Sequence, residues 1–243
     1  MSYPDVAWRS TLNHSAGAMT MSLFRLCLVT LVTFAVGLPV RAQGALSWRD
    51  KVTAFVAANM QHTAWGVSHA ERDYRLALEI ARRDGISVDD DVLFAAAMLH
   101  DIAAFAPWAK AGVDHGVRAA EVIPDSLVAW GFPAAKIARV QDAVSHHMYS
   151  NTVGTGAEAQ VLRDADTLDF LGWEGITRIL SLATRHRWAT DVATAVATLR
   201  RNAVDLPPTL STAAGKAMAE PRVAAMRTYL AGLDAELKGI GAP

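Results

Sequence analysis

The sequence predicts an all-α fold, and two patterns support this prediction. From Ser47 onward, apolar residues recur at spacings of three and four, as they do on one face of an amphipathic helix. No stretch alternates apolar and polar residues with the β-branched enrichment that is typical of strands. The chain has 243 residues, 52% of them hydrophobic, which is enough to form one sizeable core. We therefore expect one helical domain over residues 47–243.

Capping and breaking residues mark the ends of the expected helices. Ser68 and Glu71 have the spacing of a capping box, and Gly85 stands where the same helix should end. Pro107 should stop the following helix and Pro133 should open a later one, because proline has no amide hydrogen to donate within a helix. The expected helices are Trp48–Gln61, His69–Asp84, Asp91–Phe105, His115–Gly131, Pro133–Met148, Ala157–Leu171, Trp173–Arg187, Asp191–Ala203 and one or two between Ser211 and Lys238. The expected loops are residues 151–156 and 206–209.

Charge and cysteine content exclude several classes of protein. The formal net charge is −1 and basic residues are interspersed with acids, so no basic stripe could neutralise a nucleic acid backbone. We therefore expect no nucleic acid partner. Cys27 is the only cysteine and no zinc-finger spacing occurs, so a metal site would have to use histidine and carboxylate ligands. The sequence leaves the oligomeric state open.

The N-terminal residues have the pattern of an export signal. Arg25 is followed by 15 uncharged and mostly apolar residues, 26–40, a length that is short for a membrane span and typical of a signal peptide. Val40 and Ala42 stand three and one residues before a possible cleavage site. We expect residues 1–42 to be removed, leaving a periplasmic or secreted protein with no membrane span. The alternative is an uncleaved membrane anchor.

Histidines gather in the middle of the chain, where five of the eight lie between residues 69 and 147. His69 is expected in the first turn of its helix, where the helix dipole disfavours imidazolium and leaves a neutral ring able to ligate a metal. His100 and Asp101 interrupt an apolar run over residues 91–106, with no arginine one turn away to compensate a buried carboxylate. A divalent cation is the simplest partner for this pair.

Asp166 is a further candidate for the same site. It is expected in the middle of a helix, with Arg163 and Asp169 three residues before and after it, so that the three share one face. Together with the earlier histidines and Asp101, it gives the residue order H…HD…D.

This order resembles the signature of the HD-domain metal-dependent phosphohydrolases of the prokaryotic single-domain type. The resemblance covers about residues 50–190. Five segments carry it in order: SHAERDYRLALEIA, AAMLHDIA, DHGVRAAEVI, AVSHHM and DADTLDFLG. It implies that the helical domain is a single HD-domain bundle.

The resemblance also implies the ligands of one or two divalent cations. The signature positions that hold the first ion in this family correspond here to His69, His100, Asp101 and Asp166. A second ion would use Asp101 as a bridge together with His115 and one or both of His146 and His147, of which we favour His147. Mixed histidine and carboxylate ligands suit Mn, Fe, Co, Ni or Zn.

The expected activity is that of an exported phosphohydrolase, which hydrolyses a phosphate ester or nucleotide with metal-activated water. Asp101 would fix the metal, Arg72 and Lys110 are candidates to hold the negative charge of a small-molecule substrate, and Glu71 is a candidate base or cap partner. Asp169 is expected to support a ligand rather than to be one. The alternatives on the same fold are a hydratase of a small nitrile such as cyanamide, a di-iron oxygenase and a non-catalytic ligand-binding protein.

The export signal predicts the N-terminus of the mature protein. Mass spectrometry of the cell-envelope fraction should find a chain that begins near Gln43, whether translation starts at Met1, Met19 or Met21. A full-length chain in the cytoplasm would contradict export. Deletion of residues 1–42 should leave the thermal stability of the domain unchanged, since the helical pattern begins at Ser47.

Overall fold

The computed structural model describes residues 46–183 and 191–240. Gly44–Pro243 form one compact unit, and every regular element among the described residues of this unit is a helix. The predicted all-α fold is therefore confirmed. The predicted signal peptide over residues 1–42, and the end of the helix expected over Trp173–Arg187, lie outside the described residues. No helix in the described part of the chain is long and apolar enough to cross a membrane.

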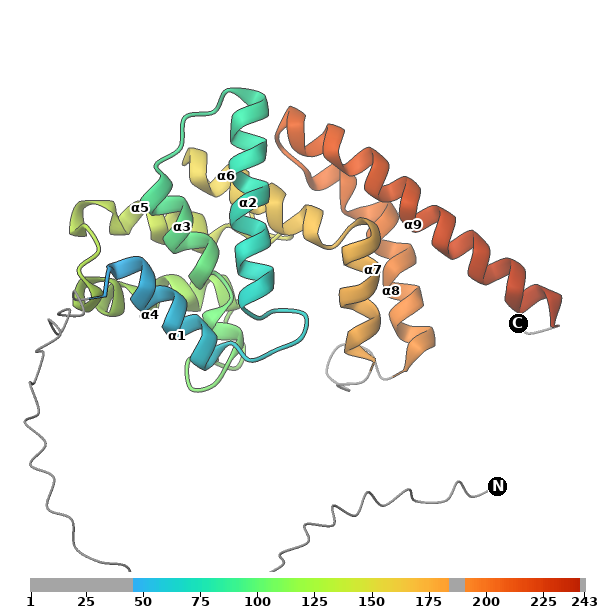
Figure 1. Cartoon of the computed structure of the whole chain (residues 1–243), viewed down its shortest axis with the longest axis horizontal. Helices are drawn as coiled ribbons and strands as arrows, with labels where there is room; N and C mark the ends of the chain where they lie inside the picture. Colours follow the sequence, from blue (N-terminus) through green and yellow to red (C-terminus); the bar gives the residue numbers. More distant parts are fainter. Residues whose placement is uncertain (1–45, 184–190, 241–243) are drawn as a thin grey trace, which may run out of the picture. The chain divides into compact units, whose positions relative to one another are not determined.

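Nine α-helices and three short 3₁₀ helices occupy the described ranges (Figure 1). The α-helices are α1 (Trp48–Asn59), α2 (Val67–Asp84), α3 (Asp90–Leu99), α4 (His115–Trp130), α5 (Ile137–Ser145), α6 (Ala157–Asp169), α7 (Gly172–Leu182), α8 (Val192–Asp205) and α9 (Ala213–Gly239). The 3₁₀ helices are η1 (Ile102–Ala104), η2 (Ala134–Lys136) and η3 (Pro207–Thr209).

Helices α2 and α6 form the centre of the bundle. α2 packs on both α3 and α6, α5 packs on α3, α4 and α6, and α7, α8 and α9 pack on one another (Figure 1). α9 also contacts α2 and α6. Fully buried side chains from α2, α3 and α6, including Ile80, Leu93 and Leu162, join in one apolar core. This core fixes the start of α2, the end of α3 and the last turn of α6 next to one another.

The predicted capping box at Ser68 and Glu71 is wrong. α2 begins at Val67, and its N-cap is Gly66, which offers no side-chain hydrogen bond. A Cβ atom at Gly66 would lie 2.6 Å from the carbonyl oxygen of His62, so the tight turn before α2 requires glycine at this position. The helix therefore starts at the turn rather than at the serine, and His69 still falls within the first helical turn.

Two other helices are shorter than predicted, and both changes affect the histidines. The helix expected to reach Phe105 ends at Leu99, because His100 is its C-cap and Asp101 leaves helical geometry with φ −95° and ψ 2°. The helix expected over Pro133–Met148 is divided into η2 and α5, and α5 ends at Ser145. The ligand candidates therefore stand at helix ends, where side chains can converge.

Elsewhere, the predicted loop over residues 206–209 contains η3, and one helix, α9, follows it.

Asp164 joins the N-terminus of α9 to α6. Its buried carboxylate accepts hydrogen bonds from the backbone amides of Ser211 and Thr212 at 2.9 and 2.7 Å and from both hydroxyl groups at 3.1 and 2.6 Å. The backbone comes so close that a Cβ atom at Gly215 would lie 2.7 Å from this carboxylate. Asp164 thus holds the two residues that lead into α9, while Asp84 and the N-cap Thr212 accept hydrogen bonds from amides of its first turn.

Replacing Asp164 with alanine should destabilise the fold strongly. The change leaves buried amides and hydroxyls without an acceptor, and we expect a loss of about 3 kcal/mol in the free energy of unfolding, measured by urea denaturation. Asp234→Ala is the matched control, because Asp234 forms an exposed ion pair with Arg200 and should contribute little. Similar stability of the two variants would contradict this account.

Candidate metal centre

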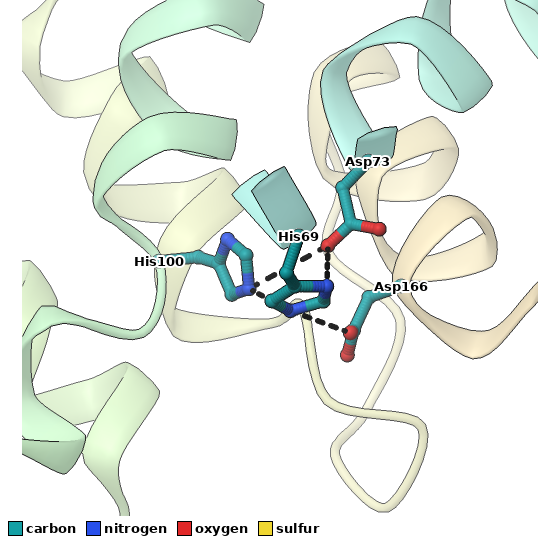
Figure 2. Close-up of side chains that lie close together, drawn as sticks. All are labelled: His69, Asp73, His100 and Asp166. Carbon is teal, nitrogen blue, oxygen red and sulfur yellow. Dashed lines mark hydrogen bonds and ion pairs between the residues drawn. The ribbon is translucent and has the colours of Figure 1, made fainter. Parts of the chain in front are cut away.

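Four buried side chains from three helix ends bring their polar atoms together. His69 Nε2 lies 3.2 Å from His100 Nε2, 3.4 Å from Asp101 Oδ2 and 3.6 Å from Asp166 Oδ1. His100 Nε2 is also 3.4 Å from Asp101 Oδ2. Figure 2 shows His69, His100 and Asp166 pointing toward one another. Ligand atoms that each lie about 2.1 Å from one cation are about 3–4 Å apart, so these four atoms have the spacing of a metal site.

The second oxygen of Asp101 faces a second group of donors. Asp101 Oδ1 lies 3.1 Å from His115 Nε2 and 3.7 Å from His147 Nε2, and these two nitrogens are 3.2 Å apart. His115 is the first residue of α4, whose N-cap is Asp114. The carboxylate of Asp101 therefore lies between two clusters, with one oxygen toward each.

Hydrogen bonds at the opposite ring nitrogens orient three of the histidines. His100 Nδ1 donates to the carbonyl of Ala97 at 2.8 Å, and His147 Nδ1 donates to the carbonyl of Val144 at 2.7 Å. His69 Nδ1 donates to Asp169 at 2.8 Å. Because these contacts place the proton on Nδ1, they leave the lone pair of Nε2 available to an ion.

The adjacent histidines His146 and His147 have different environments. His147 is fully buried beside Asp101, whereas the side chain of His146 is 31% exposed. His146 Nδ1 lies 2.8 Å from the carbonyl oxygen of Asp142 and 3.2 Å from its carboxylate. The structure thus brings His147 to the centre and directs His146 toward α5.

Asp169 accepts a hydrogen bond from His69 and from two arginines. It accepts from Arg72 Nε at 2.9 Å and from Arg178 Nη1 at 2.7 Å. Burial alone would raise the pKa of Asp169, but the hydrogen bonds from His69 and Arg72 hold it well below its usual range. Arg72 also pairs with Glu174 at 3.0 Å. Arg72, expected from the sequence to hold substrate charge, thus pairs with these two acids in the structure.

The charges of the centre are strongly coupled. Burial would lower the pKa of His100, but the negative charge of Asp101 raises it to about 10. Burial would likewise raise the pKa of Asp101, but His100 lowers it well below its usual range. The metal-free pair is therefore an imidazolium and a carboxylate, and a bound cation would take the place of the proton.

Asp73 is the residue that the sequence analysis missed. It lies in α2 four residues after His69, with its Oδ2 3.2 Å from His69 Nδ1 and 3.7 Å from His100 Nε2 (Figure 2). Burial raises the pKa of Asp73 to about 8. The spacing of four residues on one helix was the available signal, because it places both side chains on one face.

A cavity of about 650 Å³ opens beside the centre. Asp101, His115 and Asp166 line it, as do Lys110 and Arg201. Arg201 belongs to α8, and sequence reasoning gave no signal for it. The aromatic residues of the wall are His62, Trp65, Phe105, Tyr149 and Phe170. Glu71 does not line this cavity; it pairs with Arg75 at 3.6 Å.

Comparisons with known proteins agree with this arrangement. The family model of the HD domain matches residues 66–171. A predicted HD superfamily hydrolase from an uncultured Thermotogales bacterium is 27% identical, with 76% of this chain and 89% of that chain covered and a TM-score of 0.54. An HD-superfamily hydrolase from Bacillus thuringiensis is 20% identical, with coverages of 78% and 96% and a TM-score of 0.58.

A third similar structure contains a nucleotide. YpgQ from Bacillus subtilis, solved in complex with ADP, is 23% identical, with 79% of this chain and 99% of that chain covered and a TM-score of 0.60. Identities this low show a shared fold. No curated protein matches the sequence significantly.

The geometry predicts opposite results for the two adjacent histidines. His147→Ala should lower the metal content by about one ion per chain, because it removes one of the two imidazoles beside Asp101 Oδ1, whereas His146→Ala should leave the metal content unchanged. Elemental analysis after Mn²⁺ loading measures both, with thermal melting as a check of folding. Equal losses in the two variants would show that the centre uses different ligands.

Proposed function

This chain is an HD-domain superfamily protein, and from that premise we propose that it is a metal-dependent hydrolase of a phosphorylated small molecule. One observation carries the proposal: the carboxylate of Asp101 lies between two pairs of imidazoles, with one oxygen toward each pair. Two cations held side by side can act on the attacking and leaving oxygens of the same phosphoryl group.

The residues present fit divalent cations. We propose that the first ion is held by His69, His100, Asp101 and Asp166, and the second by Asp101, His115 and His147. The burial of Asp101 and Asp166 supports this, because carboxylates without compensation by a cation or by well-placed donors are costly inside a protein. The donor set suits Mn, Fe, Co, Ni or Zn.

When bound, such cations polarise a phosphoryl oxygen and lower the pKa of a water molecule. The protein's own contribution is to bind and orient the substrate. Lys110 and Arg201 line the cavity and offer positive charge to a substrate. Aromatic rings such as Trp65 and Tyr149 offer flat apolar surface to the remainder of the substrate. This combination fits an organic phosphate better than inorganic phosphate alone.

We also propose that the protein acts outside the cytoplasm. Support comes from the apolar segment over residues 26–40, which follows Arg25 and precedes a possible cleavage site after Ala42. The substrate would then be an extracytoplasmic phosphate ester.

The test of the function is phosphate release by the Mn²⁺-loaded protein from aryl phosphates and from nucleoside phosphates, including ADP. Asp101→Ala should lower kcat/KM by about 100-fold or more, because the contribution of bound cations amounts to several kcal/mol. It should also remove bound metal. His146→Ala is the control and should keep both metal and activity.

The same protein should be tested with cyanamide. Formation of urea without phosphate release from any phosphate ester would replace the proposed hydrolase with a nitrile hydratase. A fully loaded protein that transforms neither class of substrate would contradict both activities.

A further inference from the structure

Asp73 is a buried acid that accepts no hydrogen bond from the fold. Its side chain is fully buried, and neither carboxylate oxygen receives a hydrogen bond. Among the described residues it is the only carboxylate with both oxygens in this state. An isolated carboxylate without partners costs several kcal/mol inside a protein. The imidazoles of His69 and His100 lie 3.2 and 3.7 Å away without donating a hydrogen bond to it, so the position lacks the close partners that a carboxylate needs.

Other buried acids in the same region accept hydrogen bonds from well-placed donors. Asp164 receives hydrogen bonds from two amides and two hydroxyls, and Glu158 receives them from the amide of Asp89 at 2.7 Å and from Arg139 at 2.6 Å. The fold therefore supplies donors to carboxylates whose role is structural. Asp73 differs from them in this respect.

His69 cannot satisfy Asp73. Its Nδ1 carries a single proton, and Asp169 accepts that proton at 2.8 Å, whereas Asp73 Oδ2 is 3.2 Å away. The remaining contact of Asp73 is His100 Nε2 at 3.7 Å, and this nitrogen is the one directed at the centre. In Figure 2, Asp73 lies over His69 with one oxygen toward His100.

We infer that Asp73 is a fifth protein ligand of the first cation, joining His69, His100, Asp101 and Asp166. One ligand atom from each of His69, Asp73, His100 and Asp166 can be chosen so that all four lie within 4.8 Å of one another. The inference rests on the proposed function to the extent that a cation must bind here. It assigns to this chain a first site with three carboxylates and two imidazoles.

The additional carboxylate has a consequence for the choice of metal. Carboxylate oxygens suit Mn²⁺, which accepts a large coordination number, whereas Zn²⁺ is satisfied by four ligands and binds imidazole well. Removing the carboxylate of Asp73 should therefore weaken Mn²⁺ binding more than Zn²⁺ binding. A structural role of Asp73 would not distinguish between the two ions.

The experiment compares the wild type with Asp73→Asn by calorimetric titration of the metal-free proteins with Mn²⁺ and with Zn²⁺. We expect the Mn²⁺ affinity of the variant to fall about 10-fold or more, since even residues that only orient metal ligands contribute 10- to 100-fold. The Zn²⁺ affinity should fall less. The metal-free variant should melt no lower than the metal-free wild type, because no hydrogen bond is lost.

Asp164→Asn is the matched control, since it makes the same chemical change at a buried acid that has donors. It should lower the melting temperature of the metal-free protein and leave the affinity for both ions unchanged. Asp73→Asn with wild-type Mn²⁺ affinity, or with equal losses for the two ions, would overturn the inference while leaving the proposed function intact. A wild type that binds neither ion would overturn both.

Discussion

The burial of one carboxylate, that of Asp101, is the constraint on which the rest of the site depends. Only 4% of this residue is exposed, and its two oxygens face imidazoles from α2, the end of α3, the start of α4 and the segment after α5. In this structure these side chains come from places where helices begin or end, which lets adjacent residues such as His100 and Asp101 both reach the centre. The early end of α3 at Leu99 thus positions His100 and Asp101 for the centre.

Helix α6 supplies the opposite side of the site and shows how the fold distributes buried charge. Eleven of its 13 residues are buried, three aspartates among them. Asp164 holds the start of α9, Asp166 reaches the centre, and Asp169 fixes His69 with the help of two arginines. Since the helix turns by about 100° per residue, these spacings direct Asp164 away from the other two. One helix therefore anchors the C-terminal region and orients the centre at the same time.

The sequence allowed the helical class and the order of His69, His100, Asp101 and Asp166 to be predicted, because periodicity and residue order are properties of the chain alone. It could not show the start of α2, which depends on the close approach of Gly66 to His62, a contact across a turn. Arg72 was expected to face substrate because charge is visible in a sequence, whereas its partners Asp169 and Glu174 lie about 100 residues away along the chain. Asp73 was missed because an acid beside arginines in a helix is usually paired with one of them. Its lack of hydrogen-bond donors is visible only in three dimensions.

The cavity is lined by residues from two parts of the chain. The ligand candidates and the lysine of the cavity come from residues within the range matched by the HD family, 66–171. Thr198, Arg201 and Asn202 also line the cavity, and they come from α8, which lies beyond that range. Under the proposed function, residues near the ions would act on the phosphoryl group, which all phosphate esters share, so they would not distinguish one ester from another. Selection would then depend on the groups that meet the rest of the substrate, and on α8 the charged residue that lines the cavity is Arg201.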